Sequence, residues 1–180
     1  MPPQALFGIS IGLGFVAWGV VTRQYIWPTL RVRQRADALR PILLLHSFRF
    51  VGLAFLVPGV VSPDLPTTFA RPAAYGDLAT TILALLGMAT LPSQLGIIVV
   101  WALNLLGAAD LLNAFYQGAR TGVGLEPGLQ GAADFIPTFL VPLLLITHGV
   151  VFRLLLQRNS VAASEAATLL QGAGPLKVSS

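Results

Sequence analysis

The sequence predicts an all-α integral membrane protein, a bundle of five transmembrane helices with its N-terminus outside and its C-terminus in the cytoplasm. Hydrophobic residues make up 55% of the 180-residue chain and charged residues only 10%, with a mean hydropathy of +0.77. A soluble domain carries about 25% charged residues. The hydrophobic residues also gather in five blocks, most of them about 20 residues long, which is the length that crosses a bilayer as a helix.

The first block, about 4–25, has no charge before Arg23. A cleaved signal peptide would carry its basic residues before the apolar run, so we expect a retained helix. The second block begins at Pro41, because proline suits the first turn of a helix. The segment 62–76 contains three prolines and is predicted as a loop, which places Asp77 in the first turn of the next helix. The predicted spans are 4–25, 41–61, 77–91, 96–116 and 135–156, in a single domain over 1–158 with a short cytoplasmic tail over 159–180.

The basic residues predict the orientation. Five spans place nine of them on one side (Arg23, Arg31, Arg33, Arg35, Arg40, Arg49, Arg153, Arg158 and Lys177) and only Arg71 and Arg120 on the other. Cytoplasmic loops are enriched in Lys and Arg, so the first side is the cytoplasmic one. Anionic lipids are the expected partners of Arg31, Arg33, Arg35 and Arg40, and nucleic acid is not needed to explain them. Ten arginines to one lysine indicate a bacterial protein, which we expect in the cytoplasmic membrane as a multi-pass protein.

Polar side chains inside the spans form two groups. The first group is His46, Arg49, Asn104 and His148, which the predicted spans place in the cytoplasmic half. Two histidines on different helices at similar depth can ligate a b-type haem, with Arg49 pairing a propionate. No carboxylate is expected at that depth, so a metal site is not predicted.

Helical side chains lean toward the N-terminus of their own helix, which for these two antiparallel spans points the rings of His46 and His148 apart in depth. The alternative to a haem site is that these residues have structural roles. His46 and Arg49 then extend to the inner headgroups, and His148 donates a hydrogen bond to a backbone carbonyl of a neighbouring helix or to one freed near a proline kink.

The second group faces outward. Asp110, Asn113 and Gln117 are spaced i, i+3, i+7 and share one face of a helix. With Asp77 and Tyr116 they form the candidate ligand or proton site. A charge inside a span costs ~3 kcal/mol or more, so Asp110 needs a reason to be there. It pairs with Arg71 or Arg120, or is protonated, or lines a water-filled pocket open to the outside. Asp134 is expected to cap the last helix.

Sequence signatures of enzymes are missing: neither G-x-S-x-G nor H-E-x-x-H occurs. The stretch from Arg49 to Gly59, Arg-Phe-Val-Gly-Leu-Ala-Phe-Leu-Val-Pro-Gly, followed by Tyr75-Gly-Asp77, resembles DoxX-type small bacterial membrane proteins. Those have four spans rather than five, and some belong to membrane oxidoreductase complexes. The resemblance covers under a quarter of the chain, and no site residues are carried over from it.

Three functions remain. The first is a non-enzymatic subunit or binding protein with an outward-facing polar pocket around Asp110. The second is a haem-binding redox protein that uses His46 and His148. The third is a small transporter or proton-coupled carrier, as a homo-oligomer or within a larger membrane complex, because five short spans enclose little volume.

Overall fold

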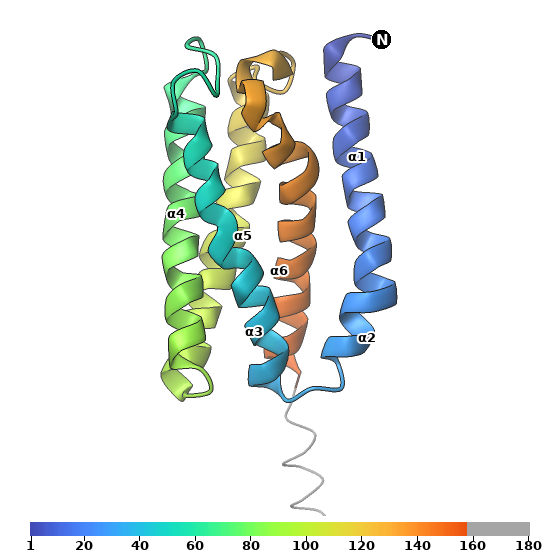
Figure 1. The fold of residues 1–180 in the computed structure, drawn as a ribbon, viewed down its shortest axis with the longest axis vertical. Coiled ribbons are helices and arrows are strands. Elements are labelled where there is room, and N and C mark those ends of the chain that lie inside the picture. The colour runs from blue at the N-terminus through green and yellow to red at the C-terminus, as the bar shows by residue number, and fades with distance from the viewer. Residues whose placement is uncertain (158–180) are drawn as a thin grey trace, which may run out of the picture.

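The computed structural model describes residues 1–157, and the predicted cytoplasmic tail lies outside them. The described residues are helices and connecting loops without a β-strand. Five helices are long and apolar enough to cross a membrane: Pro3–Leu30, Arg35–Leu56, Thr67–Thr90, Gln94–Arg120 and Ile136–Leu156. Their directions alternate, so that the N-terminus, the 57–66 loop and the 121–135 segment lie at one end of the bundle (Figure 1). We call this the N-terminal end and the opposite one the C-terminal end.

Three of the five helices change their winding along their length. The first consists of α1 (Pro3–Val21), a π-helical turn η1 (Thr22–Ile26) and α2 (Trp27–Leu30). The second joins α3 (Arg35–His46) to the 3-10 helix η2 (Ser47–Leu56), and the last joins the π-helical turn η4 (Ile136–Leu140) to α6 (Val141–Leu156). Between them lie the two long helices α4 (Thr67–Thr90) and α5 (Gln94–Arg120) and a 3-10 segment η3 (Pro127–Asp134).

Two helices start earlier than the prolines predicted. Pro41 lies inside α3, which begins at Arg35, and Pro72 lies inside α4, which begins at Thr67. The prediction that 62–76 is a loop was therefore wrong from Thr67 onward. Each proline costs a backbone hydrogen bond, but its neighbours are buried in the bundle, and this packing holds the helix together. The buried neighbours are Ala38, Leu39, Ile42 and Leu43 around Pro41, and Phe69, Ala70, Ala73 and Ala74 around Pro72.

These earlier starts change the depth of the polar residues. His46 and Arg49 follow a helix start that is six residues earlier than predicted, which moves them roughly 9 Å deeper at 1.5 Å per residue. Asp77 is not in a first turn, because α4 begins ten residues before it, at Thr67. All three side chains are buried. The prediction that His46 and Arg49 extend to the headgroups was therefore wrong.

The buried core has three layers. An apolar cluster at the C-terminal end packs α3, α4, α5 and α6 together around Leu39, Leu43 and Leu103. A second apolar cluster at the N-terminal end joins η2, α4, α5 and the loops around Phe55, Phe69 and Leu111. A layer of buried polar side chains lies between the two clusters, and every long helix except the first contributes to it. These side chains are His46, Arg49, Asp77, Asn104, Thr147 and His148. This polar layer positions the candidate site.

Candidate functional site

Arg49 is the centre of the polar layer. Its Nε donates to Asp77 Oδ1 at 2.6 Å, and its Nη2 donates to Asp110 Oδ2 at 2.8 Å. Its Nη1 lies 3.2 Å from the carbonyl oxygen of Gly107 and 3.1 Å from His148 Nε2. One guanidinium thus joins η2 to α4, α5 and α6, and its side chain is fully buried. Arg49 and His148 of the first predicted group and Asp77 and Asp110 of the second therefore belong to one cluster. The partner of Asp110 is Arg49, not Arg71 or Arg120, which are exposed.

The winding of η2 explains how Arg49 reaches its partners. A 3-10 helix has three residues per turn, so residues three apart lie directly above one another. Arg49, Gly52 and Phe55 have this spacing, and all three are buried. One line of side chains therefore faces α4, with the charge at one end and an aromatic ring at the other.

Two glycines let the helices approach each other at the acidic residues. A β-carbon on Gly52 would collide with the carboxylate of Asp77, and one on Gly76 would collide with the carboxylate of Asp110. Each acid therefore sits against the backbone of a neighbouring helix, where no side chain separates the two. This close approach is what allows one arginine to contact both acids.

The hydrogen bonds of His148 define its tautomer. Nε2 faces Arg49, which can only donate, so Nε2 accepts and the proton lies on Nδ1. Nδ1 then donates to Asn104 Oδ1 at 2.7 Å, while Asn104 Nδ2 donates to the carbonyl of His148 at 3.3 Å. Asn104 and His148 thus form a two-way pair that holds the ring as a neutral acceptor for Arg49.

His46 lies next to His148 but has different partners. The ring centroids are 4.3 Å apart, so the prediction that the two rings separate in depth was wrong. His46 Nε2 is 3.2 Å from Thr147 Oγ1, and within residues 1–157 its Nδ1 has no hydrogen-bond partner.

These histidines do not fit an axially ligated haem. Metal–imidazole bonds are about 2 Å long, so an iron between two rings would separate their ligating nitrogens by about 4 Å and leave the macrocycle between the rings. Here the rings are in contact, and both nitrogens of His148 are already engaged by Arg49 and Asn104.

The charges of the cluster do not balance. Two carboxylates, Asp77 and Asp110, face one guanidinium, and His148 is the neutral acceptor described above. With both acids ionised, the cluster has one excess negative charge. In the buried interior of the bundle such a charge costs several kcal/mol unless a proton or a cation balances it.

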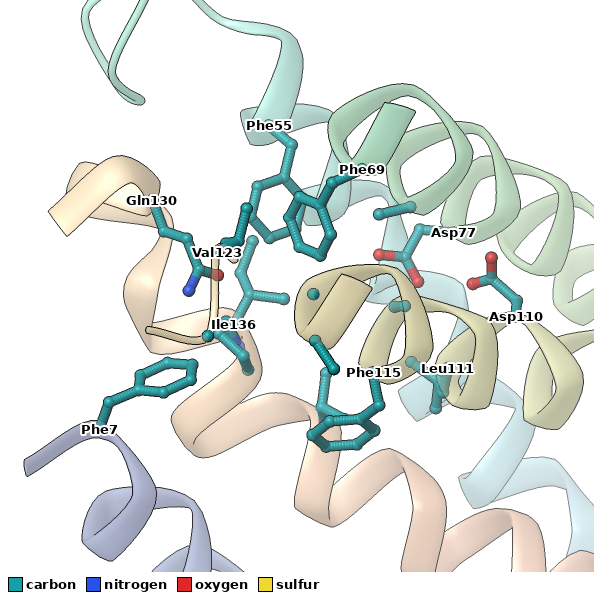
Figure 2. Close-up of a pocket in the computed structure, with 17 residues that line it drawn as sticks. Phe7, Phe55, Phe69, Asp77, Asp110, Leu111, Phe115, Val123, Gln130 and Ile136 are labelled. Carbon is teal, nitrogen blue, oxygen red and sulfur yellow. The ribbon is translucent and has the colours of Figure 1, made fainter. Parts of the chain in front are cut away.

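A cavity of about 220 Å³ opens above the cluster, toward the N-terminal end (Figure 2). Its walls are mostly apolar and include residues of all five long helices, among them Phe7 of α1 and Phe55 of η2. Asp77 and Asp110 lie on its lining, but Arg49 and His148 do not. The cavity therefore meets the acidic side of the cluster, and the arginine lies behind it.

Gln130 is a lining residue that sequence reasoning missed. It is 1% exposed, and its Oε1 makes no hydrogen bond to any described residue. Figure 2 shows its amide beside Val123 on the wall of the cavity. Gln130 lies in a glycine-rich segment without helical periodicity, so the sequence offered no signal that its side chain turns inward.

The remaining predicted site residues lie elsewhere. On α5 the cavity is lined by Asp110, Ala114 and Gly118, at a spacing of four residues, and by Leu111, Phe115 and Ala119 beside them. Asn113 and Tyr116 are not part of this lining, and neither is Gln117, which is half-buried. The face that Asp110 uses is therefore not the i, i+3, i+7 face that the sequence suggested.

Asp134 is not a helix cap. It is the last residue of η3, and η4 starts without a side-chain cap. Its Oδ1 is buried without a hydrogen-bond partner in the described part of the chain, and burial raises the pKa of this carboxyl above its ordinary value. Asp134 and Phe7 both line a second, more open hollow between α1 and η3.

The basic connector at the C-terminal end is partly engaged by the protein itself. Arg40 donates to the carbonyl of Leu91 at 3.0 Å, and Arg35 donates to the carbonyl of Gln157. Arg153 stacks over the ring of Trp27 at 3.9 Å. Arg31 and Arg33 are exposed. Contact of these arginines with anionic lipid stays a prediction.

Together these features define a class: an all-helical bundle with five helices apolar enough to cross a membrane, a charged cluster buried between them and an apolar cavity above it. Residues 6–156 match the family described as Domain of unknown function (DUF8737), and the chain belongs to that family. No curated protein and no solved structure matches it. The functional argument therefore rests on the site.

Proposed function

We propose that the protein is a multi-pass membrane protein that binds a small ligand in a pocket open to the outside, with Asp77 and Asp110 as the polar floor. The observation that carries this proposal is the cavity of about 220 Å³ that ends on two buried carboxylates. Binding pockets are concave and mostly apolar, with a few polar groups that orient the ligand. A purely structural ion pair would need neither the cavity nor the second acid.

The orientation is the second part of the proposal. Arg23 lies in η1, next to α2, and Arg31, Arg33, Arg35 and Arg40 lie in α3 or in the connector before it. Figure 1 shows this connector at the C-terminal end of the bundle, away from the cavity. The positive-inside rule then places that end in the cytoplasm and the cavity mouth outside. We propose the bacterial cytoplasmic membrane as its location.

The natural chain has no cysteine, so single cysteines test the pocket directly. Ala114→Cys places a thiol on the cavity wall, and Leu112→Cys places one on the same helix where the side chain is 60% exposed and faces away from the cavity. In a bilayer the second thiol faces lipid. We expect a membrane-impermeant maleimide, added to intact cells, to label Ala114→Cys and to leave Leu112→Cys unlabelled.

Arg33→Cys controls the orientation, because Arg33 is exposed in the connector at the C-terminal end. It should react only after the cells are permeabilised. The proposal fails if Ala114→Cys reacts no faster than Leu112→Cys, or if Arg33→Cys is the position labelled from outside.

A further inference from the structure

The two carboxylates at the floor of the cavity line it, but the arginine that pairs with them does not. Asp77 and Asp110 belong to the lining, whereas the side chain of Arg49 is fully buried behind them. Arg49 engages only Oδ1 of Asp77 and Oδ2 of Asp110, and the second oxygen of each acid makes no hydrogen bond to another residue in the described chain. A ligand that enters the cavity therefore meets carboxylate oxygens, which only accept hydrogen bonds.

We infer that the ligand is a small organic cation, one ammonium group on an apolar body; this inference rests on the proposed function above. The cluster holds two carboxylates and one guanidinium, so a ligand with a single positive charge brings the buried charges to balance. An anionic ligand would add a second uncompensated charge. A neutral ligand would leave the first to be balanced by a proton, whereas a cation takes the place of that proton. When the cation leaves, a proton taken up by the acid pair restores the balance.

The walls suit the same ligand. Phe7, Phe55, Phe69 and Phe115 line the cavity, and aromatic faces attract ammonium groups as well as apolar ones. Gln130 adds an unpaired carbonyl oxygen that is almost completely buried, a second acceptor separate from the acid pair. A buried acceptor without a hydrogen bond is unfavourable, and a donor on the ligand would satisfy it.

The size of the cavity sets the size of the cation. An engineered cavity of about 150 Å³ holds benzene, so about 220 Å³ accommodates one ring with a short amine-bearing arm. The loops at this end also carry acidic residues, with Asp64, Glu126 and Asp134 set against Arg71 and Arg120. This small excess of acid favours the approach of cations over anions.

Three probes with one skeleton test the charge: 3-phenylpropylammonium, 3-phenylpropan-1-ol and 3-phenylpropanoate. Each is added to membranes that contain Ala114→Cys, and the rate of maleimide labelling is measured. A bound probe shields the thiol. A charge-assisted hydrogen bond contributes about 1.5–3 kcal/mol, so the ammonium should protect at a concentration at least about tenfold below that of the alcohol. The carboxylate should not protect.

Two controls separate site binding from membrane effects. Ala119→Cys gives a second reporter on the cavity wall if Ala114→Cys does not fold, and folding of each variant is checked by gel filtration. Asp110→Asn, combined with the reporter cysteine, leaves one acid for one arginine. It should abolish the preference for the ammonium over the alcohol while the alcohol still protects.

The outcomes are distinct. The cation inference is overturned if the ammonium and the alcohol protect equally. It is also overturned if the ammonium does not protect up to about 10 mM, where binding is worth less than ~3 kcal/mol. Both results leave the pocket in place. Stronger protection by the carboxylate also overturns it. A reporter cysteine that no aqueous reagent reaches refutes the proposed function instead.

Discussion

Replacing Arg49 by methionine tests the reasoning about the polar layer. The Arg49→Met variant would keep a long apolar side chain but remove all four contacts, to Asp77, Asp110, the Gly107 carbonyl and His148. Two buried carboxylates would then face each other without a counter-charge. Removing one partner of a buried ion pair costs about 3–5 kcal/mol, and this arginine serves two acids. We expect Arg49→Met to lower the free energy of unfolding by at least about 3 kcal/mol.

The triple variant Arg49→Met, Asp77→Asn, Asp110→Asn identifies the cause. If the damage comes from uncompensated charge, neutral amides should remove most of it, because replacing a whole buried ion cluster by neutral groups is often close to neutral. If the damage comes from lost packing, the triple variant will be as unstable as the single one. Arg31→Met, at an exposed position in the connector, is the control for the loss of an arginine as such.

Thermal unfolding of the detergent-purified protein, followed by the soluble fraction or by circular dichroism, measures the difference. For a chain of this length 1 kcal/mol corresponds to about 2–4 °C, so Arg49→Met should unfold about 6–20 °C below the parent. An Arg49→Met protein as stable as Arg31→Met would refute the role of the cluster. A triple variant no better than Arg49→Met would refute the charge argument.

Three further predictions follow from the same geometry. Gly52→Ala and Gly76→Ala should each lower the free energy of unfolding by about 1–3 kcal/mol, because the added methyl group overpacks against the acids. Gly149→Ala, with open space around it, should not lower it. If all three variants unfold at the same temperature, the close approach of the helices is contradicted. Asn104→Leu should cost about 1–3 kcal/mol because it leaves the buried histidine and its carbonyl unpaired. The same change at an exposed asparagine of the same helix, Asn113→Leu, serves as the control in the same melting assay. Protein purified after expression with supplied haem should show no Soret band in its visible spectrum, because the two histidine rings are in contact; a band lost on mutation of either histidine would overturn this prediction.

The sequence predicted an all-helical bundle with five helices apolar enough to cross a membrane, and the described residues have this architecture. A span must be apolar over about 20 residues, and a composition with 10% charge leaves little choice about where the spans lie. Helix ends were harder. Local rules predicted helix starts at Pro41 and Asp77, but packing around Pro41 and Pro72 keeps α3 and α4 continuous through both prolines. Local propensity is a weak guide wherever tertiary packing opposes it.

That one error hid the site. With α4 starting near Asp77, the acid looked like an interfacial first-turn residue, and with α3 starting at Pro41, Arg49 lay too near the cytoplasm to reach it. The partner of Asp110 was sought among Arg71 and Arg120 because these lay on its side of the membrane. The observed contacts join positions 28 and 61 residues apart in the chain. No short-range pattern encodes such a pairing, although the sequence did single out Arg49, Asn104, Asp110 and His148 as polar residues inside the predicted spans.

The carrier hypothesis makes a demand that the binding hypothesis does not. A carrier must expose the same carboxylates to both sides in turn, and in this structure the cavity reaches them from the N-terminal end alone among the described residues. The C-terminal side is sealed by an apolar cluster in which Leu39, Leu43 and Leu103 are completely buried, and by Arg40, which is bonded to the end of α4. Exposing a buried leucine costs about 1.5–3 kcal/mol, so opening that side would require several such costs together. A cation or a proton that enters from the open side is enough to balance the charges at Asp77 and Asp110. Binding from one side therefore accounts for the site with fewer conformations than a carrier would need.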